Sequence, residues 1–307
     1  MNPAQQRFIE VLGRKNDTDE SGGPEFEVGL RDRLHDDLED GLGPLADDLD
    51  PDDPLWVSKH ALGGIHGCEA QFMATRNTFE WSVANARGIV AHKAIELLVH
   101  WRGDPPTLDV VDEAIARCAD SERGLGGFLQ ALKEADRAQL RGEVNDLVAK
   151  FRESVPRLRP QWYPVTESKS VCELLGGRVI LSGKVDLTLG DPKKGDKVII
   201  DLKSGRAVPG HREDLRFYAL VETLKLGTPP RALATYYLDS AQPHREDVTT
   251  PLLDTAVRRT VDGVRKMVEL RTEQREPNRS PGAPCRWCVL IDDCDDGQAE
   301  LARQRDD

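Results

Sequence analysis

Two carboxylates and a lysine stand on neighbouring β-branched runs. Asp186 ends the motif Gly-Lys-Val-Asp, and Asp201 and Lys203 belong to the motif Ile-Asp-Leu-Lys. Side chains two positions apart in a strand share a face, so Asp201 and Lys203 project together, and Asp186 can join them across a hairpin. Two converging carboxylates repel each other unless a cation lies between them, and their oxygens suit Mg²⁺ or Mn²⁺. A lysine beside such an ion can orient a water and offset charge on a phosphoryl group, which is the chemistry of phosphodiester hydrolysis.

The Asp-x-Lys spacing by itself has an ordinary alternative, because it is common and usually marks a solvated strand edge. A second pattern lies upstream, where Gly88, His92 and Glu96 recur every four residues and therefore share roughly one face of a helix. His92 also borders an apolar stripe that contains Ile89 and Ile95. A histidine in such a place is more often a core residue than a metal ligand, so the residues alone leave both interpretations open.

Taken in order, these motifs resemble the RecB-like nucleases of the PD-(D/E)XK superfamily. The family pattern runs G-x-x-x-H-x-x-x-E on a helix, then G-x-x-D, then D-x-K, then a helix with Q-x-x-x-Y. The resemblance covers about residues 56–296. It implies an α/β fold with a restriction-endonuclease-like core, in which a central mixed sheet is flanked by helices, together with an added helical region.

The resemblance also implies roles for single residues. Metal ligands would be His92, Asp186, Asp201 and the backbone carbonyl of Leu202. The catalytic set would be Asp186, Asp201, Lys203 and Tyr218. The chain departs from the pattern at Asp214, where the family has Gln. A carboxylate in place of a neutral amide near metal and DNA bears on activity or on substrate choice.

Three of the six cysteines form a C-x₂-C-x₅-C run, Cys285, Cys288 and Cys294. The resemblance, to AddB and the CRISPR-associated exonucleases among others, implies Cys68 as the fourth ligand of a [4Fe–4S] cluster. Structural Zn²⁺ on the same cysteines, or with His66 replacing one of them, is the alternative. Ligands 217 residues apart would clamp the N- and C-terminal segments around the core. Cys118 and Cys172 are expected to be ordinary buried cysteines.

The elements that must position these residues follow from the hydrophobic pattern. Helices are expected over 58–72, 85–101 and 108–154, the last with a break at the glycines of 124–127. The runs 178–189 and 197–203 predict a hairpin, followed by a helix over 211–226, a strand over 231–238 and a helix over 251–273. This order predicts an α/β core with helices on both sides of the sheet.

The net charge of −12 is unevenly distributed. Residues 1–55 hold 5 basic and 16 acidic residues, whereas the remaining 252 hold 37 and 38 and can still form a basic groove for DNA. The segment 1–55 is expected to be an acidic, mobile leader, with order beginning near Leu55. Beyond it we expect a helical region over 56–160 with the first cluster cysteine and the motif histidine, a nuclease core over 161–250, and a C-terminal helix with the cysteine cluster over 251–307.

The sequence has no apolar run of 18 residues and no basic-then-apolar leader, which predicts a cytoplasmic protein without a membrane partner. The expected function is that of a metal-dependent DNA nuclease, an exonuclease on single strands or DNA ends, in DNA repair or antiviral defence. Without a G-x-x-x-x-G-K-[ST] motif, unwinding would need a partner helicase. One alternative is a catalytically weak or inactive DNA-binding or scaffold subunit of a helicase–nuclease, CRISPR or phage-defence complex. A redox-sensing iron–sulfur protein is another.

Overall fold

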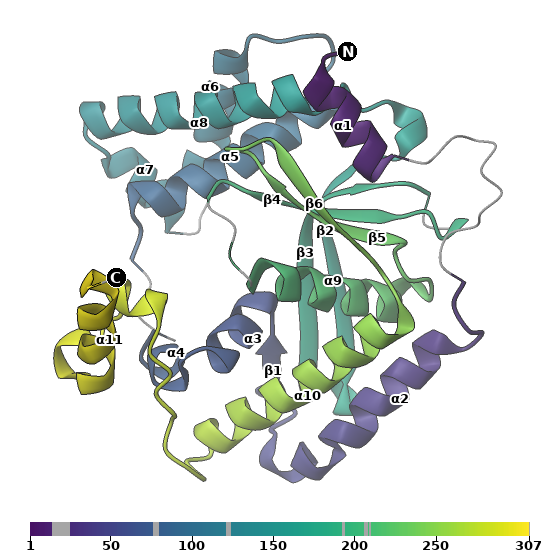
Figure 1. The fold of residues 1–307 in the computed structure, drawn as a ribbon, viewed down its shortest axis with the longest axis vertical. Coiled ribbons are helices and arrows are strands. Elements are labelled where there is room, and N and C mark those ends of the chain that lie inside the picture. Colours follow the sequence, from purple (N-terminus) through teal and green to yellow (C-terminus); the bar gives the residue numbers. More distant parts are fainter. Residues whose placement is uncertain are drawn as a thin grey trace.

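A mixed sheet lies at the centre of the molecule (Figure 1). The computed structural model describes residues 1–306 except 14–24, 76–79, 121–123, 192–193, 206–207 and 209, and within this part six strands form the sheet. They are β1 (Leu55–Val57), β2 (Val165–Leu174), β3 (Val179–Leu189), β4 (Val198–Lys203), β5 (Ala232–Tyr237) and β6 (Gln242–Asp247). The order is β1-β3-β4-β5-β6, and β2 pairs with β3. The β1–β3 and β4–β5 pairs are parallel and the other pairs are antiparallel.

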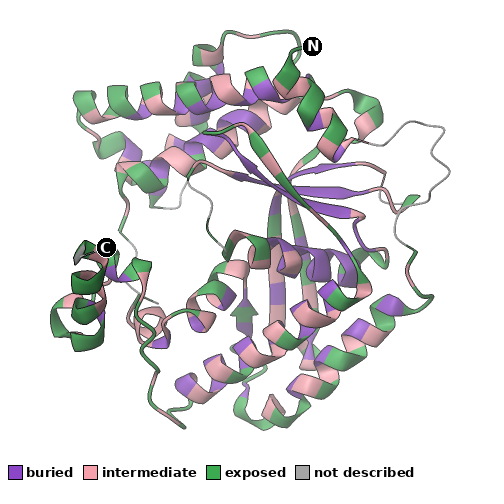
Figure 2. Cartoon of the chain, in the orientation of Figure 1, coloured by how far each residue is buried: buried purple, intermediate pink, exposed green. Residues whose placement is uncertain are grey.

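Helices cover both faces of this sheet (Figure 1). One layer consists of α5 (Val83–His100), α6 (Thr107–Ala119), α7 (Leu125–Ala131) and α8 (Glu134–Ser154). The opposite layer consists of α2 (Leu30–Leu42), α3 (Lys59–His66), α9 (Gly210–Leu226) and α10 (Thr250–Arg271). Two hydrophobic clusters fill the spaces between the sheet and the two layers. The strands and the inward helix faces are buried, whereas the outer faces are exposed (Figure 2).

Strand β3 contributes to both clusters. Val179, Leu181 and Val185 pack on the side of α9, whereas Leu187 and Leu189 pack on the side of α5. Asp186 therefore stands where β3 passes from one core to the other. In β4 the apolar residues alternate, and Asp201 and Lys203 fall on the same side of the strand as Ile199, which packs towards α9.

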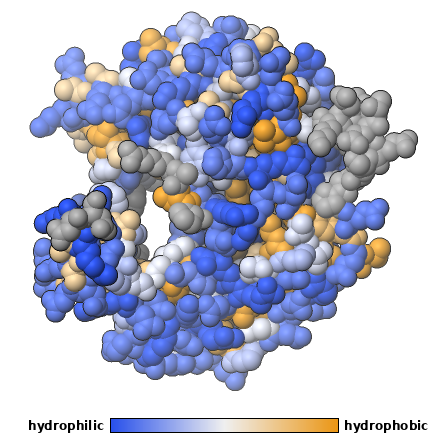
Figure 3. Space-filling view, viewed as in Figure 1, coloured by the Kyte–Doolittle hydropathy of each residue, from blue (hydrophilic) through white to orange (hydrophobic). Residues whose placement is uncertain are grey.

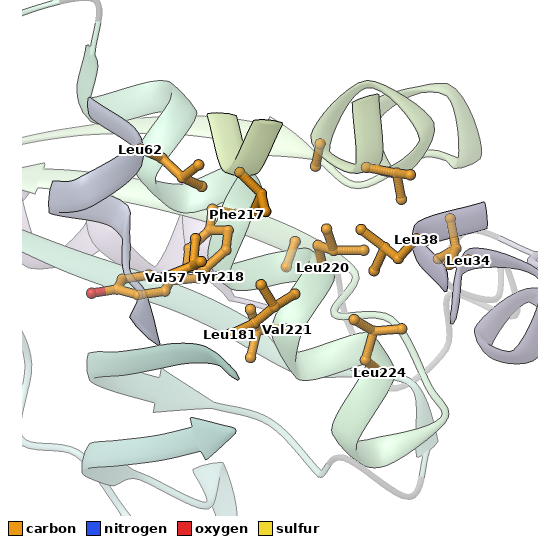
Figure 4. Packing of buried hydrophobic residues seen from close by; sticks show 14 of the residues in the cluster. Leu34, Leu38, Val57, Leu62, Leu181, Phe217, Tyr218, Leu220, Val221 and Leu224 are labelled. Carbon is orange, nitrogen blue, oxygen red and sulfur yellow. The ribbon is translucent and has the colours of Figure 1, made fainter. Parts of the chain in front are cut away.

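The acidic segment before Leu55, for which a mobile leader was expected, contains two α-helices among its described residues. Helix α1 (Pro3–Leu12) buries Phe8 and Leu12, with Phe8 packed edge-on against Tyr236. Helix α2 buries four leucines spaced four residues apart, Leu30, Leu34, Leu38 and Leu42. Leu34 and Leu38 point towards Leu220 of α9 (Figure 4). This regular spacing is the sign of an amphipathic helix, and the acidic composition of the segment obscured it.

The remaining elements are short. They are α4 (Glu69–Thr75), α11 (Asp295–Asp306) and the 3₁₀ turns η1 (Gly43–Asp48), η2 (Pro160–Trp162), η3 (Leu175–Gly177), η5 (Ala283–Trp287) and η6 (Ile291–Asp293). Helix α11 and the two turns before it form a separate projection at the C-terminal end, largely exposed (Figure 2). None of the helices in the described part of the chain is both long and apolar enough to cross a membrane.

Candidate active site and cysteine pocket

Strands β3 and β4 diverge at the predicted carboxylates. On one edge of β3, β1 pairs up to Leu181 and β4 pairs only from Leu187 onward. Residues 201–203 of β4 pair with β5 alone. We call this divergence, residues 182–186 of β3 and 201–203 of β4, the fork. Because β3 and β4 part here, their facing backbone groups do not pair with each other and can make other contacts.

Asp201 lies at the base of the fork, fully buried. Its Oδ1 lies 2.9 Å from Nζ of Lys59, and its Oδ2 lies 2.8 Å from Nζ of Lys203. The Lys59 contact is a hydrogen bond, whereas Lys203 is not aligned for one, so Oδ2 is buried without a hydrogen-bond partner. A buried charged oxygen without a partner is costly in an apolar interior and acceptable where a ligand binds.

Asp186 faces Asp201 from the other arm of the fork. Its Oδ2 accepts a hydrogen bond from the backbone N–H of Leu202 at 2.7 Å, and its Oδ1 lies 3.2 Å from Nδ1 of His92 on α5. Burial by itself would raise the pKa of Asp186, but His92 holds that pKa below its ordinary value. Burial would likewise lower the pKa of His92, and the charge of Asp186 instead raises it. The structure therefore brings His92 to the carboxylates and away from the interior of the apolar stripe.

Glu167 completes this group, although no sequence motif pointed to it. One ligand atom each from His92, Glu167 and Asp186 lies within 4.8 Å of the others, in the only such group among the described residues. The pairs Thr166–Leu187 and Ser168–Val185 place Glu167 across from Asp186. Glu167 has a φ of +54°, which is unusual for a residue with a side chain and occurs mostly where the surroundings impose it. The local sequence carries little signal for it, since only Val165, Thr166 and Val171 in β2 are β-branched.

Tyr218 and Gly183 account for two positions of the family pattern. A Cβ at position 183 would lie 2.9 Å from Cδ1 of Tyr218, so only glycine lets the ring lie against β3 at this point. Nζ of Lys59 lies 4.8 Å from the centre of the Tyr218 ring, within the range of a cation–π contact. Burial raises the pKa of Tyr218 to about 12, so the phenol stays protonated at neutral pH. Its hydroxyl oxygen points away from the apolar cluster (Figure 4).

Asp214 lies beside the lysine of the D-x-K motif. Its Oδ2 is 3.8 Å from Nζ of Lys203, and burial raises its pKa above the ordinary value of an aspartate. Asp214 therefore places a carboxyl group next to Lys203 from α9, one helical turn before Tyr218. The predicted role of the Leu202 carbonyl stays a prediction, since the contact that the structure gives this residue is the amide hydrogen bond to Asp186.

The four predicted cluster cysteines line one pocket, which we call the cysteine pocket, with a volume of about 470 Å³. Cys285 is buried, and Cys68, Cys288 and Cys294 are partly exposed. The sulfurs of Cys285 and Cys294 converge, since a Cβ at Gly297 would lie 3.6 and 3.4 Å from them. The backbone N–H of Gly282 donates to the sulfur of Cys285 at 3.4 Å. Cys68 thus lines the same pocket as the C-terminal cysteines, although it lies 217 residues before Cys285.

A polar contact next to Cys68 holds the two chain segments together. Glu69 is buried and accepts hydrogen bonds from both terminal nitrogens of Arg275, at 2.5 and 3.1 Å, and from the backbone N–H of Asn278 at 2.9 Å. The N–H of Ala70 donates to the carbonyl of Asn278. Arg275 holds the pKa of Glu69 below its ordinary value. We call these contacts the Glu69–Arg275 latch.

The two remaining cysteines lie outside the pocket. Cys118 is buried in the cluster beneath α5, as expected. Cys172 is partly buried against the opposite cluster, on the outer strand β2. Burial raises the pKa of both thiols, which keeps them in the protonated, unreactive form.

Comparison with known proteins shows the superfamily to which the chain belongs. The family model of the PD-(D/E)XK nuclease superfamily matches residues 57–295, and the chain belongs to that superfamily. A search of the curated proteins finds no significant match. Among solved structures, the chain is similar to a "Putative exonuclease" from Eubacterium rectale, with 15% identity, 90% of this chain and 94% of that chain covered, and a TM-score of 0.47. It is also similar to SSO0001, with 18% identity, 69% and 96% covered, and a TM-score of 0.33. Both scores are below 0.5, so the family assignment rests on the sequence match.

Proposed function

We propose that the protein is a metal-dependent deoxyribonuclease whose active site is the fork. The observation that carries this proposal is the convergence of Asp186, Asp201 and Lys203, with His92 and Glu167 beside them. Oxygen and imidazole ligands of this kind suit Mg²⁺ or Mn²⁺. The buried Oδ2 of Asp201, which has no hydrogen-bond partner, is a further sign that this set suits a divalent cation.

In the proposed site, His92, Glu167, Asp186 and Asp201 would hold the ion, with the Leu202 carbonyl as a further ligand. The ion would supply positive charge and Lewis acidity at the scissile phosphate. Lys203 would orient the attacking water and offset negative charge on the phosphoryl oxygens. The water oxygen forms a bond to phosphorus, the bond from phosphorus to the leaving sugar oxygen breaks, and that oxygen takes up a proton. The products are a phosphomonoester and a free hydroxyl. Tyr218 would hold the ammonium group of Lys59 over its ring.

We further propose that the substrates are single strands or DNA ends. The space-filling view shows an open gap between the C-terminal projection and the body of the molecule, bordered by both hydrophilic and apolar surface (Figure 3). A flexible strand or a frayed end can enter such an opening without the bending that a long duplex would need. A partner helicase would then supply the unwound strand.

The cysteine pocket is proposed to hold a [4Fe–4S] cluster that fastens the C-terminal projection to α4. Support comes from the four thiols around one pocket and from the backbone N–H donated to Cys285, a contact typical of cluster sulfurs. Tetrahedral zinc would need sulfurs about 3.8 Å apart, given Zn–S bonds of about 2.3 Å. No three of the described cysteines come within 4.8 Å of one another, which favours a larger group.

The nuclease proposal is tested with purified full-length protein and DNA labelled at either end, as single strands, duplexes and flaps. Cleavage with Mg²⁺ or Mn²⁺, absent with EDTA and absent in Lys203→Ala, is the expected result. Asp239→Asn serves as the control, because this exposed aspartate forms its ion pair with Lys150 and not with a charged residue of the fork. Inert wild-type protein on every substrate with either ion would favour the scaffold alternative.

The cluster proposal is tested on protein purified without oxygen. A brown colour, broad absorbance near 400 nm, and about four irons and four sulfides per chain are expected. A colourless protein that contains one zinc ion would show that the cofactor is zinc, and the proposal that a metal clamps the two segments would still stand.

A further inference from the structure

Lys59 is a lysine of α3 that contacts the fork from outside it and that no motif pointed to. It is the first residue of α3, directly after the N-cap Ser58, whose side chain accepts from the N–H of Ala61 at 3.2 Å. Its ammonium group lies 2.9 Å from Oδ1 of Asp201, 142 residues away in sequence, and the side chain is only 11% exposed.

The surroundings of Lys59 hold the ammonium in one place. It lies over the ring of Tyr218, 4.8 Å from the ring centre, and that ring in turn lies against Gly183. Strand β1 ends at Val57, immediately before α3, so the lysine enters the fork through the stretch of β3 that neither β1 nor β4 pairs. A long side chain fixed between a carboxylate, an aromatic ring and a strand has little conformational freedom left to lose when a substrate binds.

The carboxylate oxygens of the fork are therefore unequally available. Oδ2 of Asp186 is occupied by the N–H of Leu202, and Oδ1 of Asp201 by Lys59. Two oxygens carry no such hydrogen bond in the fork: Oδ1 of Asp186, which lies beside His92 and Glu167, and Oδ2 of Asp201, which lies 2.8 Å from Nζ of Lys203 but accepts no aligned hydrogen bond. They are enough for one divalent ion. A second ion, usually about 3.5–4 Å from the first in two-metal sites, would have to displace Lys59 from Oδ1 or lie against its positive charge.

We propose that the ammonium group of Lys59 takes the place of a second divalent cation, so that the fork binds a single Mg²⁺ or Mn²⁺ and Lys59 supplies the other positive charge. This inference rests on the proposed function, since it concerns how many metal ions the same site binds and which cations face the phosphate group of the substrate. In this proposal the two oxygens of Asp201 each contact one lysine. Lys59 is held in place at Oδ1, and Lys203, at Oδ2, acts on the substrate.

The test compares wild-type protein with Lys59→Met, Lys59→Arg and the control Lys150→Met, whose ion pair with Asp239 is exposed. The full chain, with its cysteine pocket loaded, is titrated with Mn²⁺ while free Mn²⁺ is followed by electron paramagnetic resonance. Wild type and Lys150→Met should bind one Mn²⁺ per chain, with cleavage rising hyperbolically with metal concentration. Lys59→Met should lose about 100-fold in cleavage rate. It should also either bind a second Mn²⁺ or recover cleavage with a sigmoidal metal dependence. Lys59→Arg, which keeps the charge, should still bind one ion.

Two Mn²⁺ per wild-type chain, with sigmoidal metal dependence and intact cleavage, would overturn the role of Lys59 and leave the nuclease proposal standing. So would a folded Lys59→Met protein with one Mn²⁺ and a rate within about twofold of wild type. Wild-type protein that neither binds Mn²⁺ nor cuts DNA would overturn the proposed function and this inference with it. Thermal melting separates these outcomes from misfolding, and Lys59→Arg carries the comparison if Lys59→Met does not fold.

Discussion

The fork and the cysteine pocket position their functional side chains by different means. In the fork, Asp186 and Asp201 stand on buried strands and are already paired with His92, Lys59 and Lys203. Around the cysteine pocket, the side chains come from helix ends and 3₁₀ turns, three of the four thiols are partly exposed, and the Glu69–Arg275 latch is the main polar contact across the two segments. The side chains of the fork are positioned by the sheet. The arrangement of the cysteine pocket depends on the group that the cysteines bind.

This difference predicts opposite consequences of substitution. Changes in the fork should affect chemistry more than folding, because the sheet and two hydrophobic clusters persist without the charges. Changes at the cysteines should affect folding first, because metal–ligand free energy there becomes folding free energy.

The largest effect is expected for Asp201→Asn. Loss of the charge that holds two lysines and a proposed metal should lower the cleavage rate by about 100- to 1,000-fold or more. Circular dichroism should show an unchanged fold. The rate is measured under single-turnover conditions beside Asp239→Asn, which should cut like wild type. A rate within tenfold of wild type would remove Asp201 from the catalytic set.

Substitution of a cluster cysteine should have the next largest effect, on stability. Cys285→Ala is expected to lower the free energy of unfolding by about 4 kcal/mol or more, on the order of what closing a long loop contributes. Cys118→Ala, a buried cysteine outside the pocket, is the matched control and should cost about 1 kcal/mol. Denaturant unfolding without oxygen measures both. Equal losses for the two variants would mean that no clamp exists at the pocket.

Glu69→Gln should weaken the latch by about 2 kcal/mol, since it removes the charged partner that Arg275 has across the two segments and leaves only its ion pair with Glu269 of α10. The pKa of Glu69 lies below its ordinary value of 4.5 in the folded protein. The ionised latch therefore stabilises the fold fully above that value and loses its contribution as the pH falls through the lowered pKa. In protein without its cluster, the gap between wild type and Glu69→Gln should be full at pH 7 and should shrink below about pH 4. A gap that does not change with pH would contradict the latch.

The smallest effect is expected at Asp214. Asp214→Gln, which restores the family residue, removes a negative charge 3.8 Å from Lys203 and should raise cleavage about two- to fivefold, as expected for a contact of up to about 1 kcal/mol. Asp214→Asn should act in the same direction, and cleavage by both is compared at equal metal concentration. A loss of more than tenfold in both variants would make Asp214 a member of the catalytic set.

Elements that depend on local interactions could be predicted from the sequence, whereas site residues that depend on contacts between distant segments could not. The hairpin is confirmed to within about a residue, because β-branched runs and the turn between them are local signals. Helices α5, α9 and α10 are likewise close to their predicted bounds. Glu167 and Lys59 could not be found in this way, since each joins the fork only through contacts between segments distant in the chain.

The helices of the acidic segment were missed for another reason. Composition averaged over residues 1–55 indicates a leader, and it hides the four-residue spacing of the leucines in α2. The four-residue spacing of the leucines by itself predicts this helix.

Anomalous diffraction from one crystal of the full-length protein, grown without oxygen and soaked in Mn²⁺, tests the central claim most directly. Data collected at the manganese and iron absorption edges would locate the two metals independently. The account predicts manganese in the fork, bound by His92 and Asp186 with Glu167 or Asp201, and iron among Cys68, Cys285, Cys288 and Cys294. Manganese bound elsewhere, with the fork residues still paired among themselves as they are here, would contradict the assignment of the fork as the metal-dependent active site.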